Sequence, residues 1–343
     1  MPMDKRPDTH PTDTGMAGGA AAPDGETLRS PKTAVPAPSG IVPVIKAYAD
    51  LTRIHFFFAW PLLFCSGLML AAATYGTFSW LLLAKGALIG FLGFEAGFVL
   101  NDYIDRDLDR RDIEHSRLTK YWRFFKSRPI PAGSVSPQAA LRLFALLSAL
   151  TLLLIATLPY PNCLFVFAIM VFSYAVEVFY QIKKRNQSFP IAQLVGRTDF
   201  ALFPVAGYLC AGYPDTTALA YFVFFYPFAM AHLGVNDLID IANDRVRQLM
   251  TIPVLYGING TVFWIGCFSI FHAITAAVFF PHMGIIAGIG IMIGLILLLV
   301  ANFLILRGSD PDSAMKALPL FHVTMVVYAG AILLDAVIRL GLV

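Results

Sequence analysis

Long apolar segments alternate with short polar connections along most of this chain. Nine segments after residue 44 are rich in Leu, Ile, Val, Phe and Ala, and each reaches the ~20 residues that a helix needs to cross a bilayer. The pattern predicts an all-α, polytopic membrane protein whose nine transmembrane helices form a bundle. We place the spans at 47–73, 78–101, 138–158, 162–182, 189–212, 217–242, 261–280, 283–306 and 317–341.

The composition supports a membrane domain preceded by a different kind of segment. Of the 343 residues, 57% are hydrophobic and 14% are charged, whereas soluble domains average about 25% charged residues. Residues 1–44 are instead rich in Pro, Gly, Ala, Thr and Asp, a composition that buries too little apolar surface to fold. We therefore expect a disordered tail at 1–44 and a membrane domain at 45–343, without a secretory signal.

The connections between the predicted spans divide into two classes by charge. Four of them contain no Lys or Arg, and the other four contain nearly all the basic loop residues. The two classes alternate along the chain, and the positive-inside rule places the basic class in the cytoplasm. This arrangement predicts a cytoplasmic N-terminus and a multi-pass protein of the cell membrane. The uncharged connections are 74–77, 159–161, 213–216 and 281–282.

One polar pattern, Asn-Asp-x-Ile-Asp-x-x-x-Asp-Arg, occurs twice in the chain. It fills residues 101–110 and 236–245, each time directly after an apolar run. Ile-Pro follows the first copy at 130–131 and the second at 252–253. Four predicted spans separate the copies, so both should emerge on the cytoplasmic side. We interpret the chain as a parallel internal repeat.

The repeated aspartates predict a site for a divalent cation. On a helix, the three aspartates of each copy fall within an arc of ~60°, where they repel one another unless a cation lies between them. A single copy would be an ordinary solvated helix end, but solvation does not explain two copies at the same spacing. Oxygen ligands of this kind select Mg²⁺, or Mn²⁺ or Ca²⁺. The predicted metal ligands are Asp102, Asp105, Asp109, Asp237, Asp240 and Asp244.

Basic residues on the same predicted face indicate that the cation is shared with a phosphate group. Arg53 precedes the first span's apolar run, Arg128 precedes Pro-Ile-Pro-Ala-Gly, and Lys184 follows the fourth span. Phosphate recognition requires such cations. We expect a central cavity, open to the cytoplasm, that holds a diphosphate between the two acidic copies.

Together these motifs resemble those of the UbiA-type intramembrane prenyltransferases. The resemblance covers roughly residues 47–341 and rests on the two Asp-rich motifs and the run Arg-Pro-Ile-Pro-Ala-Gly at 128–133. It implies Mg²⁺, held by the aspartates above, and a polyprenyl diphosphate donor. The diphosphate-binding residues that it implies are Arg53, Asn101, Arg128 and Lys184. The catalytic residues that we expect are Asp237, Asp240, Lys184 and Tyr180.

Two features depart from the family pattern. Residues 110–127 form a longer link than usual and predict an added cap, within cytoplasmic cap loops at about 102–137 and 243–260. Arg197 and Asp199 are unusual inside a span. They either form an ion pair with each other or contact the molecule that accepts the prenyl group.

These observations predict an enzyme that transfers a prenyl group to a lipophilic acceptor within the membrane. A quinone-ring precursor, a glycerol-phosphate lipid, a tetrapyrrole and a carotenoid all stay open as acceptors. The alternative is a cation-coupled secondary transporter, but such sites usually lie at the bilayer midplane between inverted repeats. A structural scaffold would not explain the duplicated acids. We expect membrane lipid as surroundings, and neither nucleic acid nor an obligate protein as partner.

Overall fold

The computed structural model describes residues 40–115 and 117–343. Their regular structure is entirely helical, in agreement with the predicted all-α class. The predicted tail lies outside the described residues up to position 39, whereas its last residues already belong to α1. The α-helices are α1 Ile41–Leu51, α2 Ala59–Tyr75, α3 Trp80–Asp109, α4 Leu118–Trp122, α5 Pro137–Ala156, α6 Asn162–Lys183, α7 Ile191–Gly196, α8 Thr198–Leu209, α9 Thr216–Ile239, α10 Ile241–Arg247, α11 Ile252–Phe279, α12 Ile285–Gly308 and α13 Pro311–Arg339.

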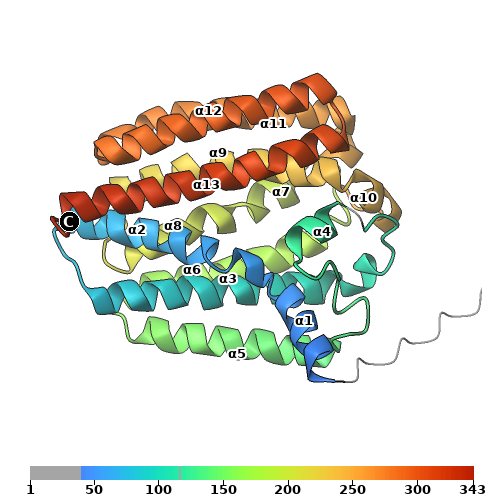
Figure 1. Ribbon diagram of the computed structural model, residues 1–343, viewed down its shortest axis with the longest axis horizontal. Coiled ribbons are helices and arrows are strands. Elements are labelled where there is room, and N and C mark those ends of the chain that lie inside the picture. Colours follow the sequence, from blue (N-terminus) through green and yellow to red (C-terminus); the bar gives the residue numbers. More distant parts are fainter. Residues whose placement is uncertain (1–39, 116) are drawn as a thin grey trace, which may run out of the picture. The chain divides into compact units, whose positions relative to one another are not determined.

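The long helices lie side by side, with the short helices α1, α4 and α10 at one end and the C-terminus at the other (Figure 1). Eight helices of the described chain are long and apolar enough to cross a membrane. The remaining predicted span, 189–212, is wrong as a continuous helix, because it consists of α7 and α8 with a break at Arg197. The predicted span 47–73 is also interrupted, because α1 ends at Leu51 and α2 begins only at Ala59. Nine crossings result when α7 and α8 are counted as one.

Polar side chains at the chain reversals begin several of these helices. The hydroxyl groups of Ser79 and Ser136 accept hydrogen bonds from backbone N–H groups three residues later, at the starts of α3 and α5. Asp215 does the same at the start of α9, and Asp310 forms a capping box at the start of α13. Each contact satisfies an N–H group that the helix itself leaves without a partner.

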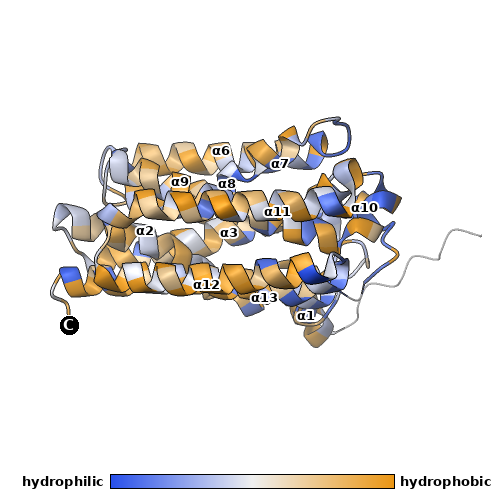
Figure 2. Cartoon of the chain, turned by 90° about the horizontal axis from the view of Figure 1, so that it is seen from above, coloured by the Kyte–Doolittle hydropathy of each residue, from blue (hydrophilic) through white to orange (hydrophobic). Residues whose placement is uncertain are grey.

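Helices α2 and α9 form the centre of the bundle, and α5 and α6 bury few of their side chains. Hydrophobic residues cover the long helices, while hydrophilic residues gather toward the end that contains α10 (Figure 2). This distribution suits a bilayer around the flanks. At the contact between α2 and α8, Gly67 and Gly207 allow the two backbones to touch. A Cβ atom at either position would lie 1.8 Å from a carbonyl oxygen of the other helix.

The predicted span 217–242 required a continuous helix through the start of the second Asp-rich motif. The structure contradicts this, because the motif is divided between two helices. Helix α9 ends at Ile239, and α10 starts at Ile241 in a new direction. Asp240 occupies the junction. The first motif, by contrast, completes the single 30-residue helix α3.

Candidate active site

A cavity of about 320 Å³ lies within the bundle and is lined by both Asp-rich motifs. Helices α2, α3, α6, α8, α9 and α13 contribute to its wall, as does the segment 110–127 that follows the first motif. The two motifs therefore face one shared space. All six predicted metal ligands line it, namely Asp102, Asp105, Asp109, Asp237, Asp240 and Asp244.

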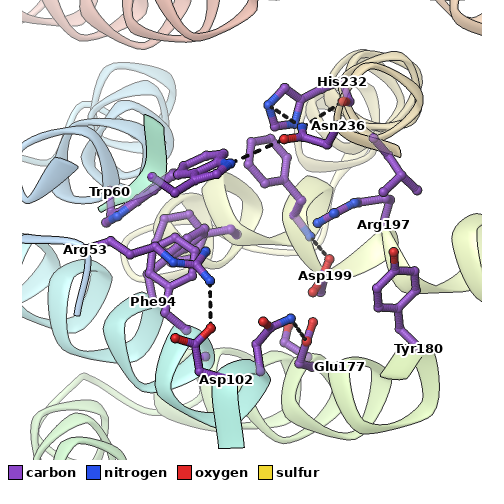
Figure 3. Close-up of a pocket in the computed structure, with 18 of the residues that line it drawn as sticks. Arg53, Trp60, Phe94, Asp102, Glu177, Tyr180, Arg197, Asp199, His232 and Asn236 are labelled. Carbon is purple, nitrogen blue, oxygen red and sulfur yellow. Dashed lines mark hydrogen bonds and ion pairs between the residues drawn. The ribbon is translucent and has the colours of Figure 1, made fainter. Parts of the chain in front are cut away.

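Basic side chains neutralise the aspartates of the first motif. Asp102 accepts a hydrogen bond from Arg53 at 3.1 Å and two from Arg123 at 2.9 and 2.7 Å. Figure 3 shows the contact of Arg53 with Asp102. Asp105 forms an ion pair with Lys184 at 2.6 Å. These carboxylates and the guanidinium of Arg123 are almost fully buried, so the pairing is needed to hold charge here.

The third aspartate of this motif joins a wider ionic network. Arg128 approaches Asp109 at 2.5 Å and Asp112 at 3.3 Å. Arg247, which follows the second motif, contacts Asp109 at 3.2 Å and also pairs with Asp112. Burial alone would lower the pKa of Arg128, but Asp109 and Asp112 outweigh it and raise that pKa. The network connects the two halves of the repeat through charge.

The negative charge of the second motif is balanced by far fewer basic side chains. Asp237 accepts only a long hydrogen bond, 3.5 Å, from the backbone N–H of Ile252. Asp244 accepts one of 2.7 Å from the hydroxyl of Thr251. Neither forms an ion pair with any basic residue of the described chain, whereas Asp240 lies 3.6 Å from Arg247.

This shortage of positive charge changes the acidity of the second motif. Burial raises the pKa of Asp244 well above its usual range, and the neighbouring carboxylates of Asp240 and Asp237 raise it further. Burial also raises the pKa of Asp240, against the opposing effect of Arg247. Buried carboxylates that lack a positively charged partner either bind a proton or face a cation. Their oxygen donors fit a hard divalent ion such as Mg²⁺.

As the side chains stand, no group of three His, Cys, Asp or Glu residues in the described chain is arranged to hold a metal ion. The first motif explains this, because its carboxylates are occupied by guanidinium and ammonium groups. A metal ion bound by both motifs would therefore have to displace these basic residues from the carboxylates of the first motif. The second motif offers carboxylate oxygens that need no such exchange.

The residues predicted to bind diphosphate or to act in catalysis also line the cavity. Arg53, Arg128 and Lys184 carry positive charge into it, and the amide of Asn101 donates to Glu177 at 2.7 Å. The ammonium of Lys184 lies 4.9 Å from the ring centre of Tyr180. The structure brings the whole predicted set together, while the role of each member stays a prediction.

Arg197 and Asp199 lie at the break between α7 and α8 and both line the cavity (Figure 3). Of the two alternatives for them, a mutual ion pair is not formed among the described contacts. Asp199 accepts from the backbone N–H of Phe200 at 2.5 Å. The guanidinium of Arg197 lies 5.7 Å from the ring of Tyr180, and its Nε is buried without a hydrogen-bond partner.

Several site residues were missed by the sequence reasoning. Arg123 and Asp112 lie in the segment 110–127, where only an unusual length was apparent. Arg247 lies in one of the basic connections and follows Asp244 by three positions. His232, which lies inside an apolar span, carried a usable signal, because ionisable residues within spans are commonly functional.

Comparison with known proteins then identifies the family. The profile of the UbiA prenyltransferase family matches residues 58–325, which is most of the chain. The chain belongs to the UbiA prenyltransferase family. The resemblance found in the motifs is thereby confirmed, and the protein is an enzyme of the prenyltransferase class. The transporter alternative has no support.

Relatives within the UbiA family differ in the reaction that their names describe. Digeranylgeranylglyceryl phosphate synthase of Thermococcus kodakarensis is 26% identical over 306 residues, which cover 86% of this chain and 99% of the relative. Protoheme IX farnesyltransferase of Neorickettsia sennetsu is 26% identical over 257 residues, covering 73% and 79%. The solved structure of a UbiA homolog from Archaeoglobus fulgidus, bound to DMAPP and Mg²⁺, shares the fold. It has a TM-score of 0.58 at 17% identity and covers 84% of this chain and 99% of its own.

Proposed function

We propose that this protein transfers an isoprenoid group from a polyprenyl diphosphate to a lipophilic acceptor within the membrane, in a reaction that requires Mg²⁺. One observation carries the proposal: two Asp-rich motifs and a group of buried cations line the same cavity. Such a combination fits a diphosphate, which is itself anionic and binds both metal ions and basic side chains.

Magnesium fits the donor set of this cavity. The aspartates of the second motif would hold it, together with those of the first once their basic partners turn to the diphosphate. The Archaeoglobus fulgidus homolog, whose structure contains DMAPP and Mg²⁺, supports this assignment. Bound there, the ion supplies positive charge that stabilises the departing diphosphate.

The protein's own residues bind the donor and collect the charge that the reaction releases. Arg53, Arg128 and Lys184 bind the diphosphate with the amide of Asn101, and the bond between its oxygen and the allylic carbon breaks. The electron pair leaves with the diphosphate, where these cations stabilise it. A carbon or hydroxyl oxygen of the acceptor forms the new bond to the allylic carbon. The acceptor's proton passes to Asp237 or Asp240.

An apolar wall surrounds the space for the isoprenoid chain. Trp60 and Phe94 stack at 3.8 Å with an angle of 10° between their rings, and Phe98 and Phe203 meet Phe94 edge to face. All four line the cavity beside the charged end. The wall offers aromatic surface to a hydrocarbon chain and excludes water from the reacting carbon.

Our proposal specifies the acceptor only by its class, a lipophilic molecule. The two relatives named above differ in the acceptor that their names give, a glyceryl phosphate lipid or protoheme. We further propose that the diphosphate end of the cavity faces the cytoplasm. Three of the basic connections lie at that end, and the segments 106–128, 183–185 and 245–247 supply cations to the cavity itself.

A pair of aspartates on the same helix, α3, tests the proposal. Asp102 is buried in the cavity, whereas the side chain of Asp107 is 64% exposed and pairs only with neighbouring arginines. We expect Asp102→Asn to reduce Mg²⁺-dependent release of diphosphate from geranyl diphosphate at least ~100-fold, the effect of removing a major charge-stabilising group. Asp107→Asn should retain full activity. Equal activity of the two variants in lipid vesicles supplied with a membrane lipid extract would contradict the proposed site.

A further inference from the structure

A chain of hydrogen bonds runs from the segment 110–127 to the second motif along one wall of the cavity. The hydroxyl of Tyr121 lies 2.6 Å from Nδ1 of His322. Nε2 of His322 lies 3.0 Å from Nε2 of His232. The amide Nδ2 of Asn236 lies 3.2 Å from that same Nε2 of His232. Tyr121, His322 and His232 are not among the residues assigned above to the diphosphate site.

The orientation of Asn236 is fixed by two further contacts. Its Nδ2 donates to the backbone carbonyl of His232 at 2.9 Å, and its Oδ1 accepts from the indole N–H of Trp122 at 3.4 Å. Figure 3 shows the contact of Asn236 with His232. Because an amide nitrogen only donates, Nε2 of His232 must accept the hydrogen bond from Asn236.

This constraint determines where every proton in the chain lies. If Nε2 of His232 carries no hydrogen, the facing Nε2 of His322 must carry one and donate it. Nδ1 of the neutral His322 then accepts from the hydroxyl of Tyr121. Burial raises the pKa of Tyr121 to about 12, so its hydroxyl keeps the proton. The neutral ring of His232 must consequently carry its own hydrogen on Nδ1.

That last hydrogen is open to the cavity. His232 lines the cavity, and its Nδ1 has no hydrogen-bond partner among the described residues. It is also absent from the polar atoms that are fully buried without a partner. The rings of Phe228 and Phe200 have their centres 6.5 and 6.3 Å from that of the imidazole, with angles of 3° and 29° between the ring planes. The Nδ1–H group of His232 therefore faces the cavity beside these aromatic rings.

We propose that His232 binds the prenyl acceptor by donating its Nδ1–H to a hydroxyl or carbonyl oxygen of that molecule. Tyr121, His322 and Asn236 are positioning residues that hold the imidazole in this protonation state. The proposal rests on the proposed function, because it names the acceptor side of the same cavity. It places the acceptor near Asp237, the residue that follows Asn236 in the chain.

The same geometry assigns His232 to binding rather than to proton removal. Its Nδ1 already carries a hydrogen, and the single lone pair of its Nε2 is already engaged by His322 and Asn236. The ring therefore has no free basic nitrogen to offer an acceptor. Proton removal is left to the carboxylates of the second motif.

Two replacements of His232 separate the roles of its two nitrogens. The amide of asparagine overlaps the position of Nδ1, so His232→Asn can keep a donor toward the cavity. The amide of glutamine overlaps Nε2, so His232→Gln keeps the contact with Asn236 and loses the cavity donor. The probes are 1-naphthol and naphthalene, which differ by one hydroxyl oxygen. Binding of each is measured by quenching of tryptophan fluorescence, since Trp60 and Trp122 line the cavity.

We expect the wild type to bind 1-naphthol roughly 3- to 10-fold more tightly than naphthalene, the net effect of one hydrogen bond. His232→Asn should keep this preference, and His232→Gln should lose it. Tyr328→Phe is the matched control, because Tyr328 hydrogen-bonds His272 in the core at 2.9 Å and does not line the cavity. It should keep the preference.

Three results would overturn the proposal: no preference for 1-naphthol in the wild type, no binding of either probe, or an undiminished preference in His232→Gln. If His232→Gln does not fold, loss of the preference in His232→Asn decides against it equally. Release of diphosphate from geranyl diphosphate is measured on the same wild-type preparation. A preparation that binds 1-naphthol selectively but releases no diphosphate contradicts the proposed function alone.

Discussion

At the scale of single residues, the two Asp-rich motifs differ in how their charge is balanced. Asp102, Asp105 and Asp109 each contact at least one Arg or Lys at 3.2 Å or closer. Asp237 and Asp244 have only neutral donors among the described residues. The repeated sequence suggests two equal halves, whereas the packing makes them unequal. We expect the second motif to depend more strongly on a bound cation.

The two adjacent lysines after α6 allow a test of this charge balance. Lys184 is buried and pairs with Asp105 at 2.6 Å, while Lys183 is only half-buried and has no ion pair with a described residue. We expect Lys184→Met to lower the rate of diphosphate release roughly 10²- to 10³-fold, because a cation at the leaving group is lost. Lys183→Met serves as the control and should stay near the wild-type rate. Equal rates in both variants would remove Lys184 from the diphosphate site.

Sequence reasoning located those site residues that belong to a repeated or recognisable motif. It placed Asp102, Lys184 and Arg128 correctly on the cavity, because their spacing and charge pattern carry the signal. It missed Arg123 and His322, whose neighbours in space are distant in sequence. Arg123 meets Asp102 only because the segment 110–127 folds back over α3. The spacing of residues along the sequence does not reveal that a loop folds back onto a helix.

At the scale of helices, apolar length predicted the long spans well and their interruptions poorly. Arg197 at the break between α7 and α8 and Asp240 between α9 and α10 lie within runs that a hydropathy pattern reads as continuous. Both breaks occur where a polar residue lines the cavity. Irregular backbone is tolerated at membrane depth when it faces such a space. The breaks coincide with the cavity, which a linear pattern does not show.

The contact between α2 and α8 predicts a strong effect of a very small substitution. A Cβ atom at Gly207 would lie 1.8 Å from the carbonyl oxygen of Phe64, which is backbone and has little freedom to move. Gly207→Ala should therefore destabilise the fold by at least the ~1–3 kcal/mol of an overpacked core. Gly330→Ala on α13 is the control, because a Cβ atom there meets nothing within 4 Å.

Thermal unfolding in detergent measures both glycine variants. Gly330→Ala should match the wild type or exceed it slightly, since alanine is the better helix former. Gly207→Ala should melt clearly below both. A melting temperature equal to that of Gly330→Ala would show that the two helices can separate without cost.

The cap of α9 predicts a dependence of stability on pH. Partial burial of Asp215 would raise its pKa, but hydrogen bonds from Tyr75 at 2.5 Å and Tyr208 at 2.8 Å, and from the backbone of Ala218, lower it overall. A carboxyl group with a lowered pKa in the folded state stabilises the protein above its unfolded pKa of ~3.9. This contribution is lost as the pH falls through the lower, folded value.

Asp215→Asn isolates that contribution. Its melting temperature should lie below that of the wild type at pH 7, and the difference should shrink as the pH falls below about 4. Tyr75→Phe should show a smaller difference with the same pH trend, because two donors to Asp215 remain. A gap between wild type and Asp215→Asn that is constant from pH 7 to pH 3 would contradict the cap's assigned role.

At the scale of the whole membrane domain, the chain alternates between two ends of different chemistry. One end contains α1, α4 and α10 together with the ionic network around Asp109 (Figure 1). The reversals at the other end contain no Lys or Arg within 74–77, 159–161 and 213–216. The positive-inside rule supports the proposal that the first end faces the cytoplasm, and the diphosphate group of the donor would then be bound from that side.

Cysteines introduced one at a time at the two ends test this orientation directly. Ala132 and Thr77 are both exposed and lie on opposite ends of the domain, after the first motif and after α2 respectively. In intact cells, we expect Thr77→Cys to react with a membrane-impermeant maleimide and Ala132→Cys to react only after permeabilisation. The wild type sets the background from its four native cysteines, of which Cys65 and Cys210 are buried and Cys163 and Cys267 are half-buried. Labelling of Ala132→Cys in intact cells would place the diphosphate end outside, where the donor would have to be supplied from the opposite compartment.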